Sequence, residues 1–110
     1  MNIKKLRIDR ARWGKERLLD SETGKMCCLG FMGIACGLSS KTITDKDMPS
    51  SLSGVAMSRY PKAFRNGNSA DIAATINDDR NISHALRESK LKKLFKENGI
   101  ALTFHGKRTR

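Results

Sequence analysis

The sequence predicts a small α+β domain in which two or three helices pack on a short antiparallel sheet. Three features lead to this prediction: an amphipathic helix near the C-terminus that ends at a glycine, an alternating strand directly after it, and an uncharged segment at residues 26–40. The uncharged segment is too short to cross a bilayer as a helix, so we expect it in the core. With 110 residues and 38% hydrophobic content, the chain has room for a single domain over residues 1–110.

The first elements expected along the chain are a strand and a turn. Residues 3–8 alternate imperfectly between apolar and basic side chains, a pattern typical of a short strand or an extended arm. Leu18 and Leu19 lead into the polar turn 20–25, where Gly24 is available for a positive φ. The start of the chain has neither the uncharged core nor the cleavage site of a secretory signal, so we expect a cytoplasmic protein.

The uncharged segment contains three glycines at helical spacing. On a helix, Gly30, Gly33 and Gly37 fall on one narrow stripe, where another backbone can approach closely. Each glycine costs about 0.8–1.0 kcal/mol of helix stability relative to alanine, so close packing has to offset that cost. In the alternative interpretation Gly37 ends the helix, and only two glycines remain in the packing stripe.

The same segment contains the three cysteines of the chain, Cys27, Cys28 and Cys36. Their spacing does not match the ligand pairs of structural zinc sites, so we predict neither a metal nor a cofactor. We expect small buried core residues in a reducing compartment. A cysteine nucleophile paired with His84 or His105 is a weaker alternative, because nothing near the cysteines in sequence would lower a thiol pKa.

Residues 39–69 are rich in Ser, Gly, Asn, Lys and Asp and contain both prolines. We expect an irregular or partly mobile loop region with one short turn of helix between Leu52 and Met57. Ser69 is then expected to cap an apolar helix over residues 70–76, which ends in the turn formers at residues 77–81.

The C-terminal helix is expected to run from Ser83, a good N-cap, to about Asn98. Its inner face is apolar and its outer face is basic, the former made by Leu91, Leu94 and Phe95 and the latter by Lys92, Lys93 and Lys96. Gly99 and Ile100 fit a Schellman stop. Residues 100–104 then alternate as a strand, which we expect to pair with an N-terminal strand or with a hairpin near Leu18, and a basic tail follows at 106–110.

Arg87 departs from the helical pattern, because its position places a cation on the inner face. A buried arginine needs an acceptor, and Asp78 and Asp79 in the preceding turn are the nearest candidates in sequence. We expect a buried salt bridge that ties this turn to the helix. The alternative is a small-ligand site in which Asp78, Asp79 and Arg87 face the ligand.

The net charge of +11 is concentrated at the two ends of the chain. Residues 1–17 contain seven Lys or Arg against two Asp or Glu, residues 18–86 are balanced, and residues 87–110 contain eight against two. This excess favours an anionic partner, although a solvated lysine-coated helix and tail would have the same composition. The candidate partner-binding residues are Lys4, Lys5, Arg7, Arg10, Arg12, Trp13, Lys15, Arg17, Lys92, Lys93, Lys96, Lys107, Arg108 and Arg110.

Two aromatic residues lie among these cations. Trp13 is surrounded in sequence by arginines and lysines, so its ring is a candidate for stacking on a base while the cations meet phosphates. In the alternative interpretation, Trp13 covers the small core. Tyr60, between Arg59 and Lys62, is the second aromatic candidate. No P-loop, GxGxxG or HExxH motif is present, so we do not expect an enzyme.

Three segments of the chain are distinctive when taken together. They are residues 6–13, the segment Gly-Lys-Met-Cys-Cys-Leu-Gly-Phe at 24–31 with its continuation to Leu38, and Ile-Asn-Asp-Asp at 76–79 followed by Leu94-Phe95 and Gly99-Ile100. In these segments the chain resembles a family of small proteins encoded by bacteriophages and prophages. The lysine-rich helix and the tail at 105–110 depart from the family's more acidic ending. The resemblance implies a small phage protein made in a bacterial cytoplasm and carries over no catalytic residues.

From the charge and the resemblance together, we expect a non-enzymatic host-takeover or counter-defence inhibitor, for example one of anti-CRISPR type. It would engage a host protein or protein–nucleic-acid complex through its basic surface. The alternatives are a regulator that binds DNA or RNA directly and a sponge for a small nucleotide. No membrane partner is expected.

Overall fold

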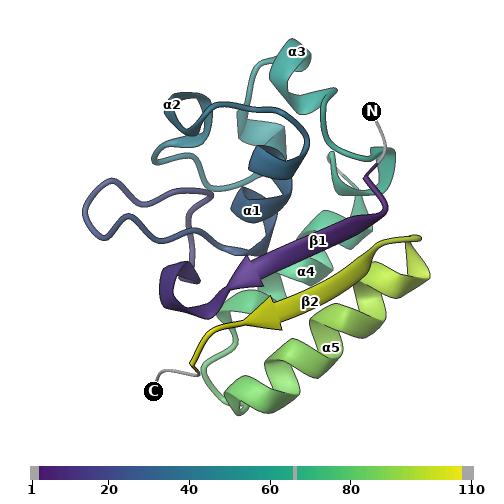
Figure 1. The fold of residues 1–110 in the computed structure, drawn as a ribbon. Helices are drawn as coiled ribbons and strands as arrows, with labels where there is room; N and C mark the ends of the chain where they lie inside the picture. The colour runs from purple at the N-terminus through teal and green to yellow at the C-terminus, as the bar shows by residue number, and fades with distance from the viewer. Residues whose placement is uncertain (1–2, 66, 108–110) are drawn as a thin grey trace.

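Two strands from opposite ends of the chain pair with each other in the computed structural model, which describes residues 3–65 and 67–107 (Figure 1). β1 (Lys5–Asp9) and β2 (Ala101–His105) run parallel, with Lys5 opposite Ala101 and Asp9 opposite His105. Of the two partners expected for the C-terminal strand, the N-terminal strand is confirmed. The antiparallel arrangement is wrong. Parallel strands need a crossover connection, and here the body of the chain between β1 and β2 provides it.

Three longer helices pack with this sheet. α1 (Cys28–Ala35) contacts β1, α5 (His84–Glu97) contacts β2, and α4 (Asn68–Asp78) contacts both of these helices. The single-turn helices α2 (Ser40–Ile43) and α3 (Gly54–Met57) complete five α-helices among the described residues, so the broad α+β class is confirmed. None of the helices in the described ranges is both long enough and apolar enough to span a membrane.

The core lies between the sheet and the helices. Alternation along β1 buries Leu6 and Ile8 and exposes Lys5 and Arg7 on the other face. The inner face of α5 is buried as expected, and the ring of Phe95 packs against that of Phe64, with centroids 5.2 Å apart. The described residues therefore form a single compact domain around one core.

The glycines of α1 follow the alternative interpretation. A Cβ at Gly30 would overlap the main-chain carbonyl of Leu18, and one at Gly33 would overlap the hydroxyl of Tyr60. Gly37 lies beyond the helix end with φ +96°, a conformation that favours glycine. Two glycines therefore form the packing stripe, and the third ends the helix.

Burial raises the thiol pKa values of the cysteines and makes the ring of Tyr60 inaccessible. Cys27, Cys28 and Cys36 are free and buried, and burial raises the pKa of the Cys27 thiol to about 12. Burial likewise raises the pKa values of Cys28 and Cys36. Tyr60 is fully buried and donates a 2.8 Å hydrogen bond to the carbonyl of Leu29, so it has no face available for a base.

Segment 39–69 contains short helical elements. Besides α2 and α3 it forms 3-10 turns at Pro49–Ser51 and Lys62–Phe64. The helical turn expected between Leu52 and Met57 is confirmed as α3. Ile43 and Phe64, both fully buried, attach the segment to the core.

The predicted ends of α5 are confirmed, whereas the predicted ends of α4 are wrong. Ser83 caps α5, and beyond Gly99 the amide of Ile100 donates to the carbonyl of Phe95, as in a Schellman stop. α4 begins at Asn68, and its N-cap is Gly67 rather than Ser69. It also continues to Asp78, so Asn77 lies inside the helix, where its side-chain hydrogen bonds compensate for its weak helix propensity.

Candidate functional site

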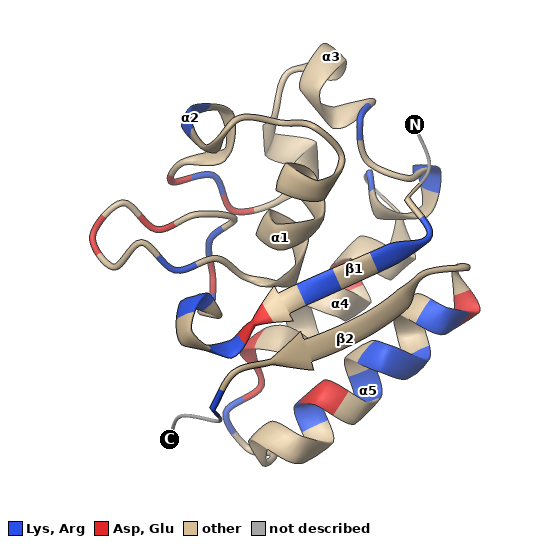
Figure 2. Cartoon of the chain, in the orientation of Figure 1, with Lys and Arg blue, Asp and Glu red and all other residues tan. Residues whose placement is uncertain are grey.

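The pairing of β1 with β2 brings the two basic ends of the chain onto one side of the molecule. Figure 2 shows Lys and Arg along β1 and along α5, with β2 between them carrying neither. We define the basic surface as six exposed cations, namely Lys4, Lys5, Arg7, Lys92, Lys93 and Lys96. The two basic segments therefore form one surface, a point that the sequence alone left open.

A shallow hollow of about 460 Å³ lies within the basic surface. Lys4 comes from the N-terminal segment, and Lys92 and Lys96 come from α5; the three lysines surround an apolar floor that includes Ile100 and Leu102. The ammonium of Lys92 also lies 5.9 Å from the centre of the Phe104 ring. Residues of both ends thus line the same depression.

The cations of the basic surface are not neutralised. Within residues 3–65 and 67–107, none of the six forms an ion pair with a carboxylate. Like charges held side by side at a solvated surface are free to attract an anionic partner. This lack of internal pairing distinguishes the six from two other cations expected at the site, Arg10 and Arg17.

Two of the predicted binding arginines hold the fold together. Arg10 donates to both carboxylate oxygens of the buried Glu88 at 2.8 Å, and to the carbonyl of Gly106 at 2.7 Å. Arg17 pairs with Asp45 at 3.0 Å. The Glu88 contact raises the pKa of Arg10, mainly through the side-chain hydrogen bond. Neither guanidinium is fully available to a partner.

The remaining predicted binding residues are distributed around the site. Arg12 is exposed after β1, Lys15 is half-buried, and Lys107 is exposed after β2. Arg108 and Arg110 lie outside the described residues.

Trp13 takes the second of its two expected roles and packs against the core. Its ring lies 4.8 Å from that of Phe104 and 6.4 Å from that of His84, and the guanidinium carbon of Arg87 is 5.9 Å from its centre. The indole N–H donates a 2.6 Å hydrogen bond to Asn77. The ring is therefore half-buried within a cluster.

Sequence reasoning missed two buried polar residues, Asn77 and Glu88. Asn77 opens a run of turn formers, and no local signal marks it as a core residue. Glu88 had such a signal, because it lies three residues before Leu91 and seven before Phe95, on the inner face of α5. Each is satisfied by partners far along the chain.

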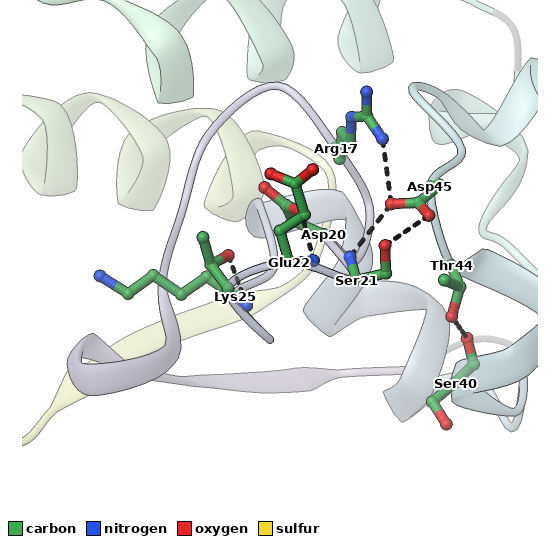
Figure 3. Close-up of polar contacts among 9 residues, drawn as sticks. Arg17, Asp20, Ser21, Glu22, Lys25, Ser40, Thr44 and Asp45 are labelled. Atoms are coloured by element: carbon green, nitrogen blue, oxygen red, sulfur yellow. Dashed lines mark hydrogen bonds and ion pairs between the residues drawn. The ribbon is translucent and has the colours of Figure 1, made fainter.

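A second cavity, of about 310 Å³, lies beside Trp13. Its walls come from residues 10–15, from the 20–25 loop and from the first turns of α5, with Lys15, Lys25 and Arg87 among the cations that line it. The 20–25 loop is also attached to Asp45, whose carboxylate accepts hydrogen bonds from the amide and the hydroxyl of Ser21 (Figure 3). Lys25 extends away from this contact in the same view.

The salt bridge expected between Arg87 and an aspartate is wrong. Arg87 donates to the main-chain carbonyl of Asp79 instead of its carboxylate. The Asp79 carboxylate accepts from the amide of Asn81, and the Asp78 carboxylate accepts from Glu16 N and Asn77 Nδ2. Of the three residues in the expected ligand site, only Arg87 lines this cavity.

Comparisons of the chain with protein-family models, with curated proteins and with solved structures find no match.

Proposed function

We propose that the protein is a non-enzymatic binding protein whose basic surface contacts the phosphate backbone of DNA or RNA, free or held in a nucleic-acid-handling complex of a bacterial host. One observation carries this proposal. β1 and α5 bring six exposed cations from both ends of the chain to one side of the molecule, and no carboxylate among the described residues pairs with them.

The chemistry of this surface favours phosphates over bases. Tyr60 is fully buried and Trp13 is packed against Phe104, so neither provides a free stacking face beside the lysines. Lysine ammonium groups contact phosphates without reading sequence. We therefore propose binding that depends weakly on sequence and strongly on salt.

The setting we propose is that of a phage or prophage protein that acts in host takeover or counter-defence. The segments at 6–13, 24–38 and 76–79 support it through their resemblance to phage-encoded proteins. Binding to nucleic acid, or to the complex that holds it, would block a host effector without any catalytic step, as an inhibitor of anti-CRISPR type does.

Fluorescence anisotropy with labelled duplex and single-stranded oligonucleotides tests the binding. If six phosphates are neutralised, affinity for the duplex falls about a thousandfold between 50 and 200 mM salt. The triple variant K92E/K93E/K96E should lose binding. The control K41E/K46E/R59E makes the same charge change at exposed cations outside the basic surface and should retain most of it. No binding by the wild type at the lower salt concentration would refute direct nucleic-acid contact.

A pull-down from bacterial lysate with and without nuclease tests the setting. Capture of a host complex that nuclease abolishes indicates a nucleic-acid bridge. Capture that survives nuclease, and that K92E/K93E/K96E loses, indicates that the basic surface contacts an acidic protein instead.

A further inference from the structure

We propose that the cavity beside Trp13 is a binding site for a phosphate monoester and that Arg87 is its principal anion ligand. This site is separate from the basic surface, because none of the six cations of that surface lines the 310 Å³ cavity.

Arg87 is only 3% exposed, and within the described part of the chain it forms no ion pair with a carboxylate. Its guanidinium donates to the main-chain carbonyls of Asp79 and, at 3.5 Å, of Ile82, and it lies 3.2 Å from Nδ1 of His84. Its Nε is buried, and no group of residues 3–65 or 67–107 accepts a hydrogen bond from it. Buried arginines are normally paired with an anion, because an uncompensated buried charge is strongly unfavourable.

The neighbouring carboxylates are committed to other groups. Glu88 accepts both contacts from Arg10, Asp78 accepts from Glu16 N and Asn77, and Asp79 accepts from Asn81. Asp20, which also lines the cavity, accepts from the amide of Glu22. An anion that enters the cavity would supply the counter-charge that these carboxylates give to other partners.

The cavity has the size and the charge for such an anion. Its volume of about 310 Å³ is at the lower end of the range for small-molecule sites. Lys15 and Lys25 add two cations to its lining, and Thr23 adds a hydroxyl. Gly14 allows the two walls to approach, since a Cβ there would lie 2.7 Å from Cβ of Lys25. The walls are thus brought together by close packing.

A phosphate fits this lining better than a carboxylate does. A planar guanidinium can present two parallel donors in a fork that matches two phosphate oxygens. A phosphate monoester carries close to two negative charges at neutral pH. The described lining of the cavity has four cations against two carboxylates, those of Asp20 and Glu88, and Glu88 is already paired with Arg10.

Two sources could supply the phosphate, a free nucleoside monophosphate or the 5′-phosphate of a strand. The second source rests on the proposed nucleic-acid binding, because the strand would also lie on the basic surface. Arg10 and Trp13, which line the cavity, both contact Phe104, as does Lys92 of the basic surface, so the two sites are neighbours.

Isothermal titration with inorganic phosphate, adenosine 5′-monophosphate and adenosine tests the site. The monophosphate should bind saturably and at least about tenfold more tightly than adenosine, as expected when charged hydrogen bonds are added. The 5′-phosphorylated and 5′-hydroxyl forms of one short oligonucleotide form the second arm. A preference for the phosphorylated strand, with weak binding of the monophosphate, assigns the site to strand ends.

Arg87→Gln should weaken phosphate binding at least about tenfold. The matched control is Arg65→Gln, because Arg65 is a partly buried arginine that also donates to main-chain carbonyls, those of Tyr60 and Ser58, and it does not line the cavity. Should Arg87→Gln fail to fold, Lys15→Gln/Lys25→Gln changes two cations of the cavity lining and should weaken binding without lowering the melting temperature.

Failure of the phosphate site can be distinguished from failure of the basic surface to bind nucleic acid. K92E/K93E/K96E should lose oligonucleotide backbone binding and keep monophosphate binding. The site is refuted if neither phosphate, nor the monophosphate, nor the 5′-phosphorylated strand shows phosphate-dependent binding. Binding that is equal in wild type, Arg87→Gln and Lys15→Gln/Lys25→Gln refutes it as well.

Discussion

The indole N–H of Trp13 donates a 2.6 Å hydrogen bond to the side-chain oxygen of Asn77, 64 residues further along the chain. The same oxygen accepts from the amide of Cys28 at the start of α1, and the Asn77 amide donates to the carbonyl of Gly14. One buried side chain therefore links the segment after β1, α1 and α4. This link positions Trp13, and with it one wall of the cavity that contains Arg87.

Asn77→Ala should destabilise the protein by about 2–4 kcal/mol, because it leaves several buried donors and acceptors without partners. Urea denaturation measures the change in the free energy of unfolding. Asn81→Ala, at an exposed position in the following turn, is the control and should stay within about 1 kcal/mol of wild type. An Asn77→Ala variant as stable as this control would contradict the role assigned to the link.

Gly30→Ala should be strongly destabilising, by about 3 kcal/mol, although alanine is normally the better helix former. The reason is that the new methyl group would overlap the carbonyl of Leu18. Gly54→Ala, at the start of α3, has open space around the added Cβ and should be neutral or slightly stabilising. Thermal unfolding of the two variants compares them directly, and equal melting temperatures would refute the packing stripe.

The three thiols should resist modification in the folded protein. Cys27, Cys28 and Cys36 are buried, and burial raises the pKa of Cys27 to about 12, so almost no thiolate is present at pH 8. With Ellman's reagent at pH 8 we expect reaction at least about a hundredfold slower in the native protein than in urea. Fast labelling of any one of these thiols in the native protein would show that it is accessible to solvent and would contradict its burial.

Asp45 should make part of the free energy of unfolding depend on pH in the acidic range. Hydrogen bonds from Ser21 and the contact with Arg17 hold the pKa of Asp45 below its usual value. The folded carboxylate therefore binds its proton less tightly than the unfolded one. This contribution is present above the unfolded pKa of about 3.9 and is lost as the pH falls through the lower folded pKa.

The substitution Asp45→Asn isolates this effect, since asparagine tolerates the positive φ of 57° at this position. The difference in free energy of unfolding between wild type and Asp45→Asn should shrink as the pH falls from about 5 to about 2. Asp47→Asn, at an exposed carboxylate two residues away, is the charge-matched control. A gap that stays constant with pH would contradict the contribution of Asp45.

Local signals in the sequence predicted much of the fold. Ser83, Gly99 and the spacing of Leu91, Leu94 and Phe95 predicted the limits and the buried face of α5, because caps and helical periodicity are encoded within one element. The inward position of Arg87 followed from the same periodicity. The start of α4 could not be predicted from local signals, because its N-cap is Gly67, which has no side chain to mark the position.

Only the tertiary structure decided how distant segments meet. Strand direction depends on how the chain crosses over between β1 and β2, and neither strand's own pattern contains that information. The same pairing turned two basic ends into one surface and committed Arg10 to Glu88, 78 residues away. Composition and spacing thus located the charge, while long-range packing determined which cations remain free to bind, because a cation's availability depends on partners that only the folded chain places beside it.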